Sequence, residues 1–211
     1  MSSARKPDPA RRTGYHHGRL REAMVEAAVE LIEEVGPYAV TVREVARRAG
    51  VSPGAPFRHF PTRMALLTAV AEEAMRRFQA EIAEALGPVA RADVRTRMIT
   101  VARAYLTWAI RNPTHFKVIS NRDLIDYAGS STLLGINTQT QALLDGLFSE
   151  AHAAGLLRGD DVAGYVLASR AQVYGLARMA ADGHLSSLNV ADRSGALYQA
   201  LDRFMAGVFR D

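Results

Sequence analysis

The sequence predicts an all-α protein, and three observations lead to this prediction. Apolar residues recur at intervals of three and four along most of the chain, as they do on the buried face of a helix. Pairs of glycine and proline, such as Gly36-Pro37 and Gly87-Pro88, interrupt this pattern where helices are expected to end. No stretch shows the strict alternation of apolar and polar residues that a half-buried strand requires.

The composition is typical of a soluble globular protein. With 48% apolar and 23% charged residues, a chain of 211 residues suits one or two domains with a sizeable core. Cysteine is absent, which excludes disulfides and thiolate metal sites and favours a reducing compartment. The sequence has neither an apolar run of the roughly 20 residues that span a bilayer nor the apolar segment of a signal peptide. It therefore predicts a cytoplasmic protein.

Positive charge is concentrated near the N-terminus. The net charge is +4, and residues 1–63 hold eleven Lys and Arg against seven Asp and Glu, so this region accounts for the whole excess. Within it, Arg43, Arg47 and Arg48 lie outside an apolar stripe and are expected to face water or phosphate. This distribution suits binding to a polyanion such as DNA.

The chain is expected to start with a mobile basic arm at residues 1–15, which are polar and contain two prolines. The arm either lies along a phosphate backbone or is simply a disordered tail. A first helix follows and ends at Gly36-Pro37. Its apolar face is formed by Leu20, Met24, Ala27, Leu31, Ile32 and Val35.

The strongest local signals lie in the stretch TVREVARRAGVSPGAPFRHF. Thr41 and Glu44 fit a capping box at the start of a helix. Gly50 stands where a helix end favours a residue with positive φ. Ser52 fits a second N-cap, with Pro53 as the first helical residue. The pattern predicts a DNA-binding helix-turn-helix motif, and the alternative is an ordinary helical hairpin whose basic residues face water.

Pro56 complicates the second helix of this motif. Counted from Ser52, it is the fourth helical residue, and its missing N–H removes an intrahelical hydrogen bond. We therefore expect a distorted first turn, followed by a short helix that carries Phe57, Arg58 and His59.

Six further helices are expected after this motif. The first has Thr62 as its N-cap and stops at Gly87-Pro88. The others are expected at about residues 92–111, 113–119, 132–154, 160–182 and 191–210.

Two stretches resemble the tetracycline-repressor (TetR) family of bacterial transcription regulators: YHHGRLREAMVEAAVELIEEVG and TVREVARRAGVSPGAPFRHFPTRMALL. The similarity is close over roughly residues 15–80. Two departures stand out. Pro56 takes the place of the usual aliphatic residue, and Arg63-Met64-Ala65 replaces a commoner Lys-Glu-Glu start while keeping the cation.

The resemblance implies a domain organisation and a function. Residues 1–15 would be the arm, residues 16–63 a three-helix DNA-binding domain, and residues 64–211 a six-helix domain for ligand binding and dimerisation. The protein would be a homodimeric repressor that binds a palindromic operator in double-stranded DNA and leaves it when a small-molecule effector binds.

The resemblance also implies which residues contact DNA. They are Thr41, Arg43, Ser52, Pro53, Gly54, Ala55, Phe57, Arg58, His59 and Arg63. Among those expected in the major groove, Arg58 is suited to a bidentate contact with guanine, which is worth about 1–3 kcal/mol of discrimination. His59 either contacts DNA or packs beneath the following helix.

Small residues form a candidate dimer interface because they let helices approach closely. The predicted interface comprises Gly164, Ala168, Ala171 and Gly175 on one helix, with Leu201, Phe204 and Val208 on the last. Together these two helices would form a four-helix interface across a two-fold axis. The alternative is that they pack only within one subunit.

Aromatic residues of the C-terminal region form a candidate effector pocket. The predicted lining is Phe78, Tyr105, Trp108, Phe116, Phe148, Gln172 and Tyr174. Further candidate polar anchors are Thr107, His115, Gln139 and Arg170. The alternative is that these aromatic residues are plain core.

Two other classes of protein were weighed. An all-α enzyme or metalloprotein is disfavoured because the sequence lacks an HExxH motif, a paired Glu-x-x-His, a glycine-rich phosphate loop and a nucleophile elbow. We therefore predict no catalytic residue, no metal site and no cofactor. A DNA-binding architectural protein without an effector is the third class, and a C-terminal core without a cavity would favour it.

Overall fold

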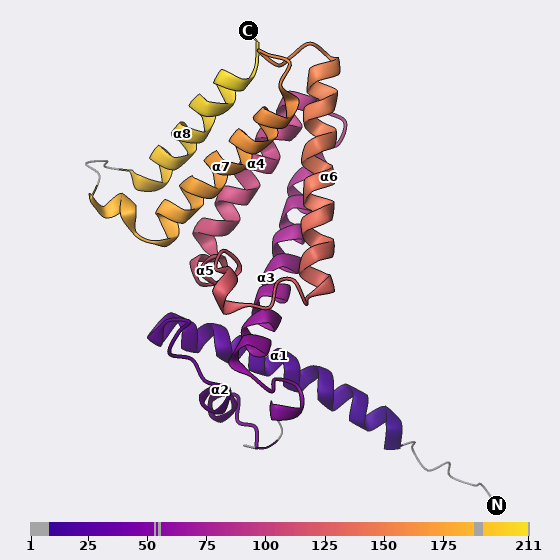
Figure 1. Cartoon of the computed structure of the whole chain (residues 1–211), viewed down its shortest axis with the longest axis vertical. Coiled ribbons are helices and arrows are strands. Elements are labelled where there is room, and N and C mark those ends of the chain that lie inside the picture. Colours follow the sequence, from indigo (N-terminus) through magenta and orange to yellow (C-terminus); the bar gives the residue numbers. More distant parts are fainter. Residues whose placement is uncertain (1–8, 53, 55, 188–191, 211) are drawn as a thin grey trace, which may run out of the picture. The chain divides into compact units, whose positions relative to one another are not determined.

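The computed structural model describes residues 9–52, 54, 56–187 and 192–210. Within these residues the chain forms eight α-helices and no β-strand, which confirms the all-α prediction (Figure 1). The helices are α1 (Pro9–Val35), α2 (Val42–Arg48), α3 (Arg63–Leu86), α4 (Val94–Arg111), α5 (Pro113–Ile119), α6 (Ser131–Ala153), α7 (Val162–Ala181) and α8 (Arg193–Val208). Four 3-10 helices occur at η1 (Pro56–Arg58), η2 (Gly87–Val89), η3 (Arg122–Leu124) and η4 (His184–Ser187). None of the described helices combines the length and apolarity needed to cross a membrane.

Helix α1 begins earlier than the sequence indicated. It starts at Pro9, inside the stretch 1–15 that was expected to be an irregular arm, and residues 1–8 lie outside the described part. Proline is well suited to a first helical position because its fixed φ is helical and its missing N–H has no helical partner there. The basic residues that follow do not oppose helix formation.

The chain divides into two compact units, and the division falls within α3. The first unit comprises Met1–Val70 with Asn121–Asp126, and the second comprises Ala71–Ser120 with Tyr127–Asp211. The sequence analysis also placed the boundary within this helix, but at its start, after residue 63. It gave no signal for the return of residues 121–126 to the first unit, where Leu124 and Ile125 are buried.

The first unit has a small core built from α1, α2 and the start of α3. Helix α1 contacts α2, and α2 contacts η1. Phe60 follows η1 and is buried, so the segment that carries the predicted DNA-contacting residues is fixed at its C-terminal end. The other central side chains of this core are Met24, Ala28, Val40, Val45, Ala46, Leu66 and Leu67.

The second unit is organised around α7. This helix contacts α4, α5, α6 and α8, and α4 also contacts α6 and α8 (Figure 1). The end of the chain is tied to the α6–α7 connection, because Leu157 and Phe209 form an isolated antiparallel bridge. The largest fully buried side chains of this unit are Leu106, Phe116, Leu133, Leu157, Leu201 and Phe209.

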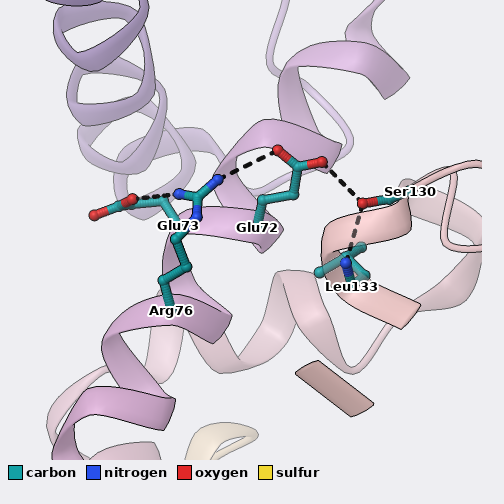
Figure 2. Close-up of polar contacts among 5 residues, drawn as sticks. All are labelled: Glu72, Glu73, Arg76, Ser130 and Leu133. Atoms are coloured by element: carbon teal, nitrogen blue, oxygen red, sulfur yellow. Dashed lines mark hydrogen bonds and ion pairs between the residues drawn. The ribbon is translucent and has the colours of Figure 1, made fainter. Parts of the chain in front are cut away.

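A buried hydrogen-bond network joins the start of α6 to α3. The Ser130 hydroxyl caps α6 by accepting from the Leu133 amide at 3.2 Å, and it donates to Glu72 Oε1 at 2.8 Å (Figure 2). Arg76 lies 3.6 Å from the other Glu72 oxygen and donates to Glu73 at 2.7 Å. Ser130 is buried and Glu72 is half-buried, so the bond to Leu133 is shielded from water and the bond to Glu72 is partly shielded.

We expect Ser130→Ala to lower the free energy of unfolding by about 1–2 kcal/mol, because α6 loses its cap and Glu72 loses a buried donor. Urea unfolding followed by circular dichroism measures the change. Ser131→Ala is the matched control, since Ser131 is exposed at the next position. Equal stabilities of the two variants would show that the network contributes nothing.

Candidate nucleic-acid interface

The start of α2 is fixed by Thr41. Its hydroxyl accepts from the Glu44 amide at 3.2 Å and donates to the Glu44 carboxylate at 2.7 Å. Thr41 has extended backbone angles, as an N-cap requires. Val40 and Val45 are buried on either side, so the predicted cap is confirmed. The Glu44 carboxylate reaches back to the Thr41 hydroxyl, whereas in the usual capping box it accepts from the backbone N–H of the cap residue.

The turn after α2 is a Schellman motif. Gly50 has φ +66°, and its amide donates to the Arg47 carbonyl at 3.3 Å. The Val51 amide donates to the Ala46 carbonyl at 3.1 Å. The positive φ predicted at Gly50 is therefore confirmed.

Gly50→Ala is expected to destabilise the protein by about 1–2 kcal/mol, because an L-residue is strained at this backbone conformation. A Cβ at Gly50 would meet no neighbour within 4 Å, so the loss of stability measures the backbone strain alone. Thermal unfolding measures it. Gly87→Ala is the control, since Gly87 also has open space around it and is not among the described glycines with positive φ. A larger loss for Gly87→Ala would contradict the strain argument.

The segment expected to enter the major groove is shorter than the sequence indicated. A single 3-10 turn, η1, takes the place of the predicted short α-helix. Pro56 begins it and is buried, and the His59 and Phe60 amides both donate to the Pro56 carbonyl. Because proline has no N–H, it cannot donate the backbone hydrogen bond that a longer α-helix through this position would need. Phe57 and Arg58, the other two residues of η1, are exposed.

One arginine of α2, Arg48, is paired with carboxylates of α1. Arg48 donates two hydrogen bonds to the Glu34 carboxylate, each of 2.6 Å, and lies 3.9 Å from Glu30. These bonds hold the pKa of Glu34 below its usual value. The Arg48 guanidinium therefore joins α2 to α1, which the sequence analysis did not foresee, although the pair is exposed to water. Arg43 and Arg47 are exposed.

Arg63 is also held by the protein. Its Nη1 donates to the Tyr38 carbonyl at 2.5 Å, in the turn between α1 and α2. The Tyr38 hydroxyl accepts from Asn121 Nδ2 at 2.7 Å. A guanidinium has five N–H donors, so Arg63 keeps donors for a phosphate. Neither Tyr38 nor Asn121 could be identified from local sequence patterns, because their partners are far away along the chain.

The structure brings most of the predicted DNA-contacting residues to one surface segment that runs from the start of α2 to the start of α3. Exposed members are Thr41, Arg43, Ser52, Gly54, Phe57, Arg58 and Arg63. His59 is half-buried. Pro53 and Ala55 lie outside the described residues.

The aromatic residues predicted to line a pocket form a contiguous cluster. The Phe78 ring lies edge-on to Tyr105 at 5.1 Å and to Trp108 at 5.2 Å. Tyr105 lies 6.4 Å from Phe116, which lies 5.8 Å from Tyr174. Burial raises the pKa of the Tyr105 phenol, and Tyr174 adds to this, so Tyr105 stays a neutral hydrogen-bond donor.

The remaining residues of the predicted pocket differ in their surroundings. Phe148 is buried in the core and Gln172 is half-buried. Thr107 is bonded to the Tyr198 hydroxyl at 2.8 Å. Gln139 accepts from Gln79, and Arg170 donates to Gln141. The last three contacts give Thr107, Gln139 and Arg170 partners within the protein, which the sequence analysis did not foresee.

The small-residue stripe of α7 is accessible. Ala168 and Ala171 are exposed, and Gly164 and Gly175 are half-buried. Gly164 has a local reason to be small, because a Cβ there would lie 2.2 Å from the carboxylate of Asp161, the N-cap of α7.

Two exposed residues that the sequence analysis did not assign to the dimer share this face. Leu167 is 71% exposed, and Tyr174, which was predicted for the pocket, is 42% exposed. Both lie within one helical turn of the small residues. The face is therefore more apolar than the small residues alone indicated.

The prediction for α8 is wrong at two positions. Leu201 and Val208 are 0% and 2% exposed and belong to the core of their own subunit. Phe204 is half-buried. The outward positions of α8 that flank it are Ala196, Ala200, Arg203 and Gly207, and the apolar periodicity of the helix did not reveal them.

Within the described part of the chain, no group of three or more His, Cys, Asp or Glu side chains is arranged to hold a metal ion.

The comparisons with known proteins agree with the architecture. Residues 24–70 match the family described as "Bacterial regulatory proteins, tetR family", and residues 98–204 match "Tetracyclin repressor-like, C-terminal domain". The second match alone covers half of the chain. The chain belongs to the tetR family of bacterial regulatory proteins.

Two curated relatives match only part of this chain. The HTH-type transcriptional regulator BetI of Cronobacter sakazakii is 31% identical over 81 residues, which are 38% of this chain and 40% of BetI. Tetracycline repressor protein class D of Escherichia coli is 28% identical over 130 residues, 61% of this chain and 59% of the repressor. The chain thus spans less than two thirds of the length of either relative.

Solved structures match over nearly the whole chain. A protein with unknown function from Rhodococcus sp. RHA1 is 30% identical, with a TM-score of 0.74, over 93% of this chain and 98% of that protein. A bacterial regulatory protein in the tetR family from Rhodococcus RHA1 is 22% identical, with a TM-score of 0.73, over 90% and 98%. The tetR fold therefore extends through both units.

Proposed function

We propose that the protein is a sequence-specific DNA-binding transcription regulator of the tetR family that acts in the cytoplasm as a repressor. The observation that carries the proposal is the capped and tightly turned segment from Thr41 to Arg63. The segment carries exposed cationic, aromatic and hydroxyl side chains, and its buried residues pack into the core of the unit. Such a short, rigid element fits the major groove of duplex DNA.

Contacts to phosphate position the protein, and contacts to bases give specificity. Arg43 at the start of α2 and Arg63 at the start of α3 are placed for phosphates, one at each end of the segment. Arg58 and Phe57 project from η1 between them. Arg58 is the side chain suited to a guanine, and Phe57 to apolar contact with a thymine methyl group.

One such segment buries little DNA surface, so operator binding requires two copies. The exposed face of α7, with Leu167, Ala168, Ala171 and Tyr174, supports a symmetric homodimer. A two-fold dimer presents two segments in opposite orientations, which matches a palindromic operator.

A small-molecule effector would bind near the aromatic cluster around Tyr105, where a neutral phenol lies among apolar rings. An effector that binds one conformation of the protein more tightly than another would shift operator binding by this difference in affinity.

The proposal is tested with the full-length protein by genomic footprinting, followed by binding titrations on the recovered sites. We expect a palindromic site bound at least about a thousandfold more tightly than random duplex. A thermal-shift screen of small molecules then identifies ligands, and those that release the operator are effectors. Equal affinity for every duplex would reject the proposal of a sequence-specific regulator.

A further inference from the structure

A groove of about 430 Å³ lies between α4 and α8, and neither the DNA-binding surface nor the aromatic cluster includes it. Arg95, Ile99 and Arg103 of α4 form one wall, and Asp202, Met205 and Phe209 form the other. Its volume is in the range of small-molecule sites.

Arg95 is the unusual member of this groove. Its Nη2 donates to the Arg210 carbonyl at 2.6 Å, and its guanidinium lies 4.6 Å from the centre of the Phe209 ring. Its Nε is buried and has no hydrogen-bond partner. Among the described residues, no carboxylate forms an ion pair with Arg95. A partly buried cation without a counter-ion attracts an anion.

The other charges of the groove cancel. Arg103 donates to both oxygens of Asp202, at 2.6 and 3.2 Å. The excess charge of the groove therefore belongs to Arg95. The remaining lining is apolar. Ile99 is half-buried and Ala206 is exposed, and the buried Met205 and Phe209 lie beneath them.

The groove is separate from the proposed dimer face. On α8, Asp202 and Ala206 are four residues apart and share one side of the helix with Phe209. Ala200 and Gly207 lie roughly 140–160° around the helix from Asp202, at 100° per residue. A molecule in the groove would therefore leave the outward side of α8 uncovered.

We propose that this groove binds a small molecule that carries one carboxylate on an apolar body. The carboxylate pairs with the Arg95 guanidinium, and the apolar body covers Ile99 and Ala206 above the buried Met205. This site is additional to the effector pocket near Tyr105 and does not depend on the DNA-binding function. A neutral molecule of the same shape would lack the charge that Arg95 requires.

The test uses octanoate and octan-1-ol with the full chain labelled with ¹³C at the methionine methyl groups. Octanoate is expected to shift the Met205 signal and to bind at least about tenfold more tightly than the alcohol. Arg95→Gln is expected to weaken octanoate binding by about tenfold or more. Arg91→Gln is the matched control, because Arg91 is exposed and does not line the groove.

The proposal would be overturned by an unmoved Met205 signal at millimolar octanoate, by equal binding of octanoate and octan-1-ol, or by unchanged octanoate affinity in folded Arg95→Gln. Arg95→Lys checks that a loss in Arg95→Gln does not arise from misfolding, since it keeps the positive charge. Retained octanoate binding in Arg95→Lys supports the charge pairing, and its complete loss in a folded protein contradicts it.

Discussion

Arg58→Ala is expected to weaken operator binding by about 5- to 150-fold, which corresponds to the loss of about 1–3 kcal/mol from a bidentate contact with guanine. Arg58 is the exposed last residue of η1, and no ion pair within the described residues holds it away from DNA. The loss should be confined to one base pair in each half-site. Fluorescence anisotropy with the operator and with single-base variants measures both quantities.

Arg43→Ala is the comparison for this prediction. Arg43 lies at the start of α2, where a phosphate contact is expected, so its removal should weaken binding to all duplexes alike and reduce the salt dependence of log K by about one. Equal losses on every sequence for Arg58→Ala would show that Arg58 contacts phosphate and reads no base. The two variants thus separate recognition from electrostatic attraction.

The features that the sequence predicted correctly depend on residues close together in the chain. The cap at Thr41 and the positive φ of Gly50 each involve a few neighbouring residues, so residue type and spacing suffice to identify them. The effect of Pro56 was foreseen in kind, because a missing N–H has a local consequence. Its extent, a single 3-10 turn, also depends on the burial of Pro56 and Phe60 in the folded unit.

The features that were missed depend on partners far away in the sequence. The sequence pattern left Arg48 free to contact phosphate, but the fold brings Glu34 of α1 beside it. Asn121 lay in an unassigned loop, and only the fold brings it to Tyr38. Periodicity identifies the apolar face of a helix, but it does not say whether that face meets its own subunit or a second one. For this reason Leu201 was assigned to the wrong surface.

Leu167→Asp is expected to convert the dimer into a monomer at micromolar concentration. Leu167 is 71% exposed in the single subunit and lies on the same face of α7 as Ala168 and Ala171. A two-fold interface on this face would bury two unpaired carboxylates, which weakens dimerisation by about a hundredfold or more. Sedimentation velocity measures the mass directly, and Ala171→Phe is a second variant that tests the same face by bulk alone.

Leu134→Asp is the matched control, because Leu134 is an exposed leucine on α6 and has no place in the proposed interface. It should remain dimeric and keep its operator affinity. Monomeric Leu167→Asp should lose operator binding even though its DNA-contacting residues are unchanged, since one segment alone covers only a half-site. If Leu167→Asp stayed dimeric, the subunits would have to meet through another surface. The small-residue stripe of α7 would then have no role in assembly.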